Sequence, residues 1–131
     1  MKLLLTVVTV LEASAGLGLL LIPIVTTAAL FSAPLDTPNG LVAARIAGAA
    51  LVALAIACWQ ARNGERGGPA TGVVAAMLFY NFAAAIVLTY AVVRLDLHSA
   101  LLWPVIVLHL GLGLWCVLNL WFARRNYQTL K

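Results

Sequence analysis

The chain has 131 residues, of which 64% are hydrophobic and 9% are charged, and its formal net charge is +4. Roughly 25% of the residues of a soluble domain are charged, so this composition excludes an ordinary water-covered surface and predicts a protein that faces lipid. The positive charge does not indicate nucleic-acid binding, because the basic residues are scattered between hydrophobic runs and form no patch.

Four hydrophobic runs are each long enough to cross a bilayer, which takes ~20 apolar residues in a helix. They cover approximately residues 3–22, 41–61, 71–93 and 100–123. The sequence therefore predicts an all-α fold, a four-helix transmembrane bundle that forms a single integral membrane domain over residues 1–131.

The stretch between the first and second spans begins at Pro23, which interrupts the helical pattern. It is too short to cross the membrane again, and its apolar residues are spaced for one face of a short interfacial helix. These residues are Ile24, Val25, Ala28 and Phe31.

The first run also resembles a signal peptide, because Lys2 precedes an apolar stretch and Ala13, Ser14 and Ala15 resemble a small-residue cleavage site. Glu12 interrupts the end of that stretch, and the hydrophobic run then resumes. We therefore expect a helix that is retained in the membrane.

Basic residues predict the orientation of the bundle, because Lys and Arg concentrate in the cytoplasmic loops of membrane proteins. With four spans, both termini and the loop between the second and third spans share one side. The basic residues on that side are Lys2, Arg62, Arg66, Arg124, Arg125 and Lys131. Only Arg94, together with Arg45 near the start of the second span, lies towards the other side. This asymmetry predicts cytoplasmic termini and a location in a bacterial inner membrane.

Three of the spans each contain a strongly polar residue near the middle. At ~1.5 Å of rise per residue, Glu12 lies ~14 Å and Asn81 ~15 Å from the cytoplasmic side, and His109 lies ~14 Å from the opposite side. In a hydrocarbon layer ~30 Å thick, all three fall near the midplane, and Arg45 lies about one turn inside the outer edge.

An ionisable residue at this depth costs at least ~2.5 kcal/mol when it has no partner, so we expect these four residues to face one another. The preferred arrangement pairs Glu12 with Arg45, and Asn81 and His109 complete the hydrogen-bond set. Two interpretations stay open: a structural ion pair that fixes the helix register, or a site that binds a ligand or a proton. For Asn81, interhelical hydrogen bonding is the simpler interpretation.

The sequence predicts no metal site and identifies no cofactor. His109 lacks the clustered ligands that a metal centre needs, although a metal or haem at His109 stays an alternative. Met77 and Cys116 have the side-chain chemistry for a soft metal such as Cu(I). No phosphate-binding loop, nucleophile elbow, HExxH pair or EF-hand loop occurs, which argues against an enzyme.

Three segments carry a resemblance to a known group of proteins. They are "VAARIAGAALVALAIACWQAR" at 42–62, "MLFYNFAAA" at 77–85 and "LLWPVIVLHLGLGLWC" at 101–116, with "LFSAPLDTPNGL" before them. They resemble uncharacterised small bacterial four-helix inner-membrane proteins, similar in layout to DoxX. The resemblance covers most of the chain and implies fold and location, but no catalytic residue. DoxX is associated with quinone-linked respiratory complexes, and no motif for that role occurs here.

Two classes of function follow from the polar residues. The first is a non-enzymatic protein that binds a small amphipathic ligand, such as a lipid or a quinone, or that supports a partner complex. Its polar cluster would consist of Glu12, Arg45, Asn81 and His109. The second is an oligomeric channel or proton-linked transporter in which Glu12 titrates and His109 relays protons. Small residues on the helix faces would also allow a homodimer.

Overall fold

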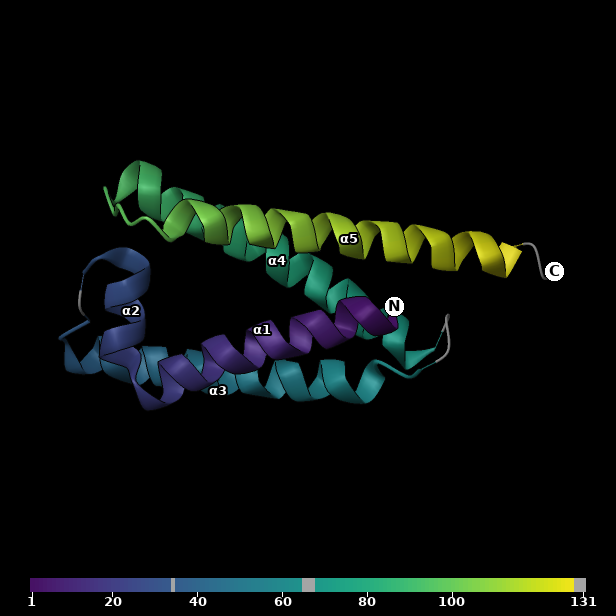
Figure 1. Cartoon of the computed structure of the whole chain (residues 1–131), viewed down its shortest axis with the longest axis horizontal. Coiled ribbons are helices and arrows are strands. Elements are labelled where there is room, and N and C mark those ends of the chain that lie inside the picture. The colour runs from purple at the N-terminus through teal and green to yellow at the C-terminus, as the bar shows by residue number, and fades with distance from the viewer. Residues whose placement is uncertain (34, 65–67, 129–131) are drawn as a thin grey trace.

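The computed structural model describes residues 1–33, 35–64 and 68–128, with the side chains of 126–128 excepted. Its helices are α1 (Lys2–Leu21), α2 (Pro23–Phe31), α3 (Pro38–Ala61), α4 (Pro69–Arg94) and α5 (Leu102–Gln128) (Figure 1). The four long helices are each long and apolar enough to cross a membrane. The predicted all-α fold with four transmembrane helices and a short helix after the first is therefore confirmed. Arg66 and Lys131, two of the residues used to predict orientation, lie outside the described residues.

Prolines set the beginnings of three helices. Pro23, Pro38 and Pro69 each occupy the first turn of a helix, where the missing backbone N–H costs nothing because it would have no intrahelical partner. The start of α3 is also capped by Thr37, whose hydroxyl accepts a hydrogen bond of 3.2 Å from the backbone N–H of Gly40.

The long helices are arranged as two pairs, because α1 packs along α3 and α4 packs along α5, whereas contacts between the pairs are sparse. Within the first pair, the backbones of α1 and α3 pack in direct contact. A Cβ atom built on Gly48 would lie 2.6 Å from the backbone nitrogen of Leu20, and one on Gly16 would lie 2.8 Å from the carbonyl oxygen of Gly48. Helices in lipid associate through such close packing of small residues.

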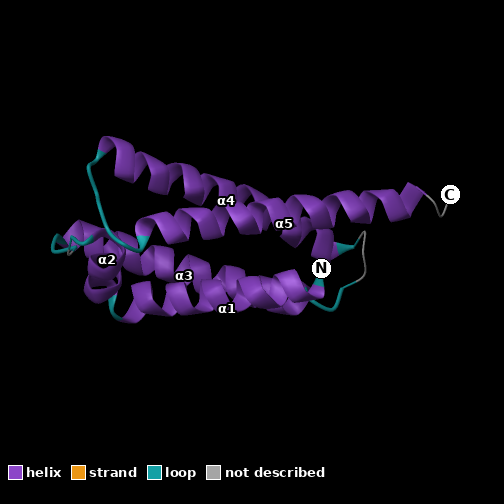
Figure 2. Ribbon diagram, turned by 45° about the horizontal axis from the view of Figure 1, so that its top comes forward, coloured by secondary structure: helices purple, strands orange, loops and turns teal. Residues whose placement is uncertain are grey.

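The two pairs meet at the end of the bundle where α1 begins and α5 finishes, called here the terminal end. Buried side chains from all four long helices form one core there. They are Leu4, Leu5, Val8, Cys58, Val74, Met77, Leu112 and Cys116. From this core α4 runs obliquely away from α1, so the pairs diverge towards the opposite end, called here the far end (Figures 1 and 2).

Helix α2 lies across the far end, transverse to the long helices (Figure 1). Leu30 and Phe31 pack against a second, smaller core formed by Val92, Leu102 and Ile106 of α4 and α5. The hydroxyl of Ser99, in the α4–α5 link, donates a hydrogen bond of 3.2 Å to the carbonyl of Ala29. The short helix therefore bridges the diverging pairs.

Two of the residues predicted for the apolar face of α2 point away from the bundle. Pro23 and Thr27 are buried, whereas Ile24 and Val25 are exposed at 48% and 62%. The reason is that α2 contacts both helix pairs on one side, so its outward face takes the apolar residues that meet lipid.

Most hydroxyl groups within the helices are bonded to the carbonyl oxygen four residues earlier on their own helix. The donors are Thr6, Thr9, Ser14, Thr26, Thr27 and Thr89, at 2.7–3.0 Å. This local bonding satisfies each hydroxyl without a partner helix.

Candidate functional site

Glu12 is 3% exposed and lies on the inner face of α1, one turn from the buried Val8 and one from Gly16. Its carboxyl group is in hydrogen-bonding range of the Tyr80 hydroxyl on α4, and a hydroxyl beside a carboxylate donates to it. Sequence analysis did not include Tyr80 in the polar cluster. A signal was present, because Tyr80 directly precedes Asn81 and thus lies at the same depth.

The predicted pairing of Glu12 with Arg45 is not formed, because Arg45 is exposed and has no ion pair within the described residues. The register of α1 against α3 explains this. The Thr9 hydroxyl lies 3.4 Å from the Ala55 carbonyl, and Gly16 faces Gly48, so Glu12 meets α3 near its middle. Arg45 is then about two helical turns, or ~10 Å, further along α3.

Asn81 and His109 do meet, as expected for polar residues at one depth. Asn81 is completely buried, and its amide nitrogen donates to the carbonyl of Met77 at 2.8 Å. Its amide oxygen lies 2.9 Å from Nδ1 of His109 on α5. This bond joins the middle of α4 to the third turn of α5.

Tyr80 connects the two halves of this arrangement. Its ring meets the His109 ring edge to face, with the centroids 5.8 Å apart and the planes at 78°. Glu12, Tyr80, His109 and Asn81 therefore form a continuous chain of contacts across α1, α4 and α5. Three of the four residues singled out from the sequence belong to it, and Arg45 does not.

A cavity of about 450 Å³ begins at this chain of contacts and extends to α2, between the two helix pairs. Its volume lies within the range typical of small-molecule sites. All five helices contribute to its wall, which is apolar except for Thr26, Tyr80 and His109. The apolar lining consists of Ala15, Leu19, Ala29, Leu30, Leu51, Ala84, Val87, Leu88, Leu101 and Val105.

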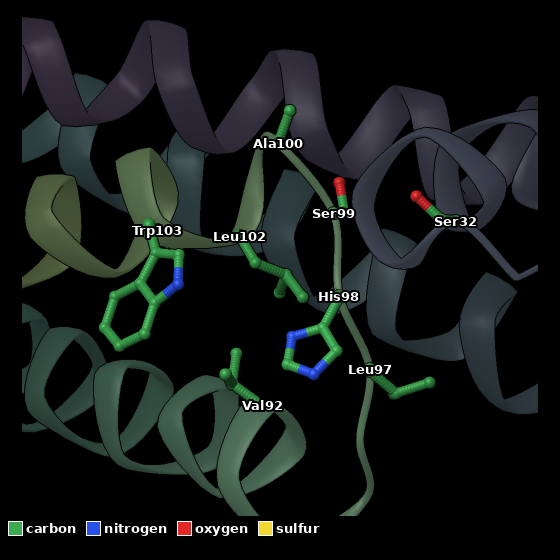
Figure 3. A pocket seen from close by; sticks show the side chains of 8 residues that line it. All are labelled: Ser32, Val92, Leu97, His98, Ser99, Ala100, Leu102 and Trp103. Atoms are coloured by element: carbon green, nitrogen blue, oxygen red, sulfur yellow. The ribbon is translucent and has the colours of Figure 1, made fainter.

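A second cavity, of about 360 Å³, lies at the far end, where the α4–α5 link passes α2 (Figure 3). Trp103, Leu102 and Val92 border one side of it, and the His98 ring borders another (Figure 3). Nε2 of His98 pairs with Asp96 at 2.8 Å, and both side chains are largely exposed. His98 therefore stands apart from the midplane chain of contacts.

Within the described residues, no three His, Cys, Asp or Glu side chains are close enough together to hold a metal ion. Met77 and Cys116 are both buried in the terminal core. The chemistry available at this chain of contacts is therefore hydrogen bonding by a phenol, an imidazole and a carboxyl group beside an apolar space.

Comparison with protein-family models, curated proteins and solved structures gives no match, so no family is identified. Of the resemblance to DoxX-like proteins, the structure shows the four-helix membrane-spanning layout. The fold defines a multi-pass integral membrane protein whose helices contact the lipid bilayer.

Proposed function

We propose that the protein holds a small lipid-like amphiphile in the midplane cavity, as a non-enzymatic protein of a bacterial inner membrane with cytoplasmic termini. The observation that carries this proposal is an apolar cavity with Tyr80 and His109 at one end, while the hydroxyl of Thr26, on α2, is bonded to the carbonyl of Ile22 within its own helix. An amphiphile has the same distribution of polar and apolar parts. A lipid and a quinone both meet this description.

The residues behind the cavity wall fit a binding role. Glu12 fixes the Tyr80 hydroxyl and Asn81 fixes the His109 ring, so both polar groups are oriented before a ligand arrives. Preorganised groups lose less conformational entropy on binding, which favours affinity. In this proposal Tyr80 and His109 contact the ligand, and Glu12 and Asn81 position them.

The terminal core favours binding over conduction. Leu4, Leu5, Val8, Val74 and Met77 are each at most 1% exposed and fill the space between the helix pairs on that side of the polar chain. A channel or a proton-linked transporter would need a polar route through this region. The cavity instead extends in the other direction, towards α2.

Native mass spectrometry tests the proposal on protein extracted gently from its own membrane. Wild type is expected to carry a small molecule that Ala84→Phe loses, because Ala84 lines the cavity. Ala76→Phe, on the exposed side of the same helix, is the matched control and should retain it. The same spectra give the number of chains and so test the homodimer.

The proposal fails if wild type and the Ala76 variant carry no small molecule while both remain folded. It also fails if Ala84→Phe retains the molecule with unchanged occupancy, since the molecule is then bound elsewhere.

A further inference from the structure

The direction of each hydrogen bond at the polar end of the cavity can be derived from the partners. The Met77 carbonyl only accepts, so the Asn81 amide nitrogen must face it and donate. The Asn81 oxygen therefore faces His109, and Nδ1 of His109 must be the donor in that 2.9 Å bond. In the neutral ring this leaves Nε2 without a proton, as an acceptor.

His109 lines the cavity and Asn81 does not. Because Nδ1 is turned to Asn81, we expect the opposite edge of the ring, with Nε2, to border the open space. Nε2 has no hydrogen-bond partner among the described residues. Since no fully buried side-chain nitrogen or oxygen in that part of the chain lacks a partner, Nε2 must be accessible.

The other two polar side chains of the cavity wall, Tyr80 and Thr26, also have hydrogen-bond acceptors for their hydroxyl protons. The Tyr80 hydroxyl is within hydrogen-bonding range of the Glu12 carboxyl group and donates to it when that group is ionised, and the Thr26 hydroxyl donates to the carbonyl of Ile22 at 3.0 Å. Each offers the cavity only oxygen lone pairs. The described side chains of the wall therefore present acceptors and no free donor.

We infer that the ligand of this cavity bears a hydroxyl group at its polar end. This hydroxyl group donates a hydrogen bond to Nε2 of His109. The inference rests on the proposed function and narrows the ligand to a long-chain alcohol. A ketone or an ether would place its own lone pairs against Nε2 and the Tyr80 oxygen. Burying polar atoms without a partner is costly, so such analogues should bind about tenfold more weakly or worse.

The test uses the full chain in detergent with His98→Gln, which leaves His109 as the only histidine. The ¹⁵N NMR spectrum of the labelled imidazole reports which ring nitrogen carries the proton. In the protein without added ligand, we expect Nδ1 to be protonated and Nε2 to be unprotonated. Adding 1-dodecanol should shift the Nε2 resonance in the direction of an accepted hydrogen bond.

Two analogues of equal size, 2-dodecanone and the methyl ether of 1-undecanol, provide the comparison. Both should bind about tenfold more weakly than 1-dodecanol and leave the Nε2 resonance in place. Asn81→Leu should reduce this preference, because the ring proton is then free to move to Nε2. Asn119→Leu is the matched control, since the bond of Asn119 among the described residues is to Trp115 on its own helix.

The possible results distinguish a failure of the hydroxyl assignment from a failure of the proposed function. Equal binding of the three probes, or a proton on Nε2 in the free protein, overturns the hydroxyl assignment while the cavity remains a binding site. If none of the probes binds and the extracted protein carries no small molecule, both the proposed function and the hydroxyl assignment are wrong.

Discussion

At the terminal end the side chains of four helices fill the interior, whereas at the far end the helix pairs part and only α2 lies between them. The terminal core contains eight buried residues, including Leu5, Met77 and Cys116. The far core contains three, and its remaining contacts come from half-buried residues of α2 and its neighbours. The cavity lies between these two regions.

The difference shows how one bundle supplies both a scaffold and a binding space. In lipid the hydrophobic effect does not draw helices together, so close packing and interhelical hydrogen bonds must hold them. The terminal core and the contact of Gly16 with Gly48 provide the packing. Because the pairs pack directly at the terminal end and are bridged by α2 at the far end, their divergence leaves an apolar space with polar groups at its inner limit.

The largest effect on stability is expected in the terminal core. Leu5→Ala should lower the free energy of unfolding by about 2–3 kcal/mol, since Leu5 is completely buried and truncation leaves a void. Leu30→Ala, at the half-buried cavity wall, should cost less than about 1 kcal/mol because no closed void forms. Equilibrium unfolding in mixed detergent micelles measures both. Equal losses would mean that the far end is as tightly packed as the terminal end.

The contact between α1 and α3 should give the next largest effect. Gly48→Ala places a methyl group against the Leu20 backbone and should cost about 1–3 kcal/mol. Gly111 of α5 has no neighbour within 4 Å of its added Cβ, so Gly111→Ala should be neutral or stabilising by up to ~1 kcal/mol. Thermal unfolding of the two variants compares them. A stable Gly48 variant would show that the helices separate without penalty.

The hydrogen bond between α4 and α5 should contribute less. Asn81→Leu is expected to cost about 1 kcal/mol, the usual size of an interhelical hydrogen bond in a membrane protein. A double-mutant cycle with His109→Leu measures the coupling between the two side chains. Asn119→Leu should change stability little. A coupling energy near zero would contradict the bond.

The smallest effect on stability belongs to the link between α2 and Ser99. Ser99→Ala removes two exposed hydrogen bonds, the one donated to Ala29 and the one accepted from the Leu101 N–H, and should change the free energy of unfolding by less than about 0.5 kcal/mol. It should nevertheless loosen α2 and speed maleimide labelling of Ala84→Cys inside the cavity. Labelling of Ala76→Cys, on the exposed face, should stay constant. An unchanged rate at both positions would show that α2 does not restrict access.

Hydrophobic patterning predicted the helices well, because the length of an apolar run and its interruption at Pro23 are local properties of the chain. It also placed Glu12, Asn81 and His109 at one depth. It failed for Arg45 because depth alone does not specify how far one helix slides along another. That register depends on the Gly16–Gly48 contact, which involves backbone atoms 32 positions apart in sequence. Tyr80 was missed for a related reason, since its role depends on the side of α4 that faces α1.

The hydroxyl groups bonded within their own helices also bear on the order of assembly. Because Thr6, Thr9, Ser14 and Thr89 are satisfied locally, these hydroxyl groups can enter the bilayer at little polar cost before the helices associate. Glu12 and His109 find their polar partners only on another helix. Their exposure to lipid before docking is costly. The packing of α4 against α5 gives His109 its partner. The association of the two helix pairs then gives Glu12 its partner on α4 and forms the binding cavity.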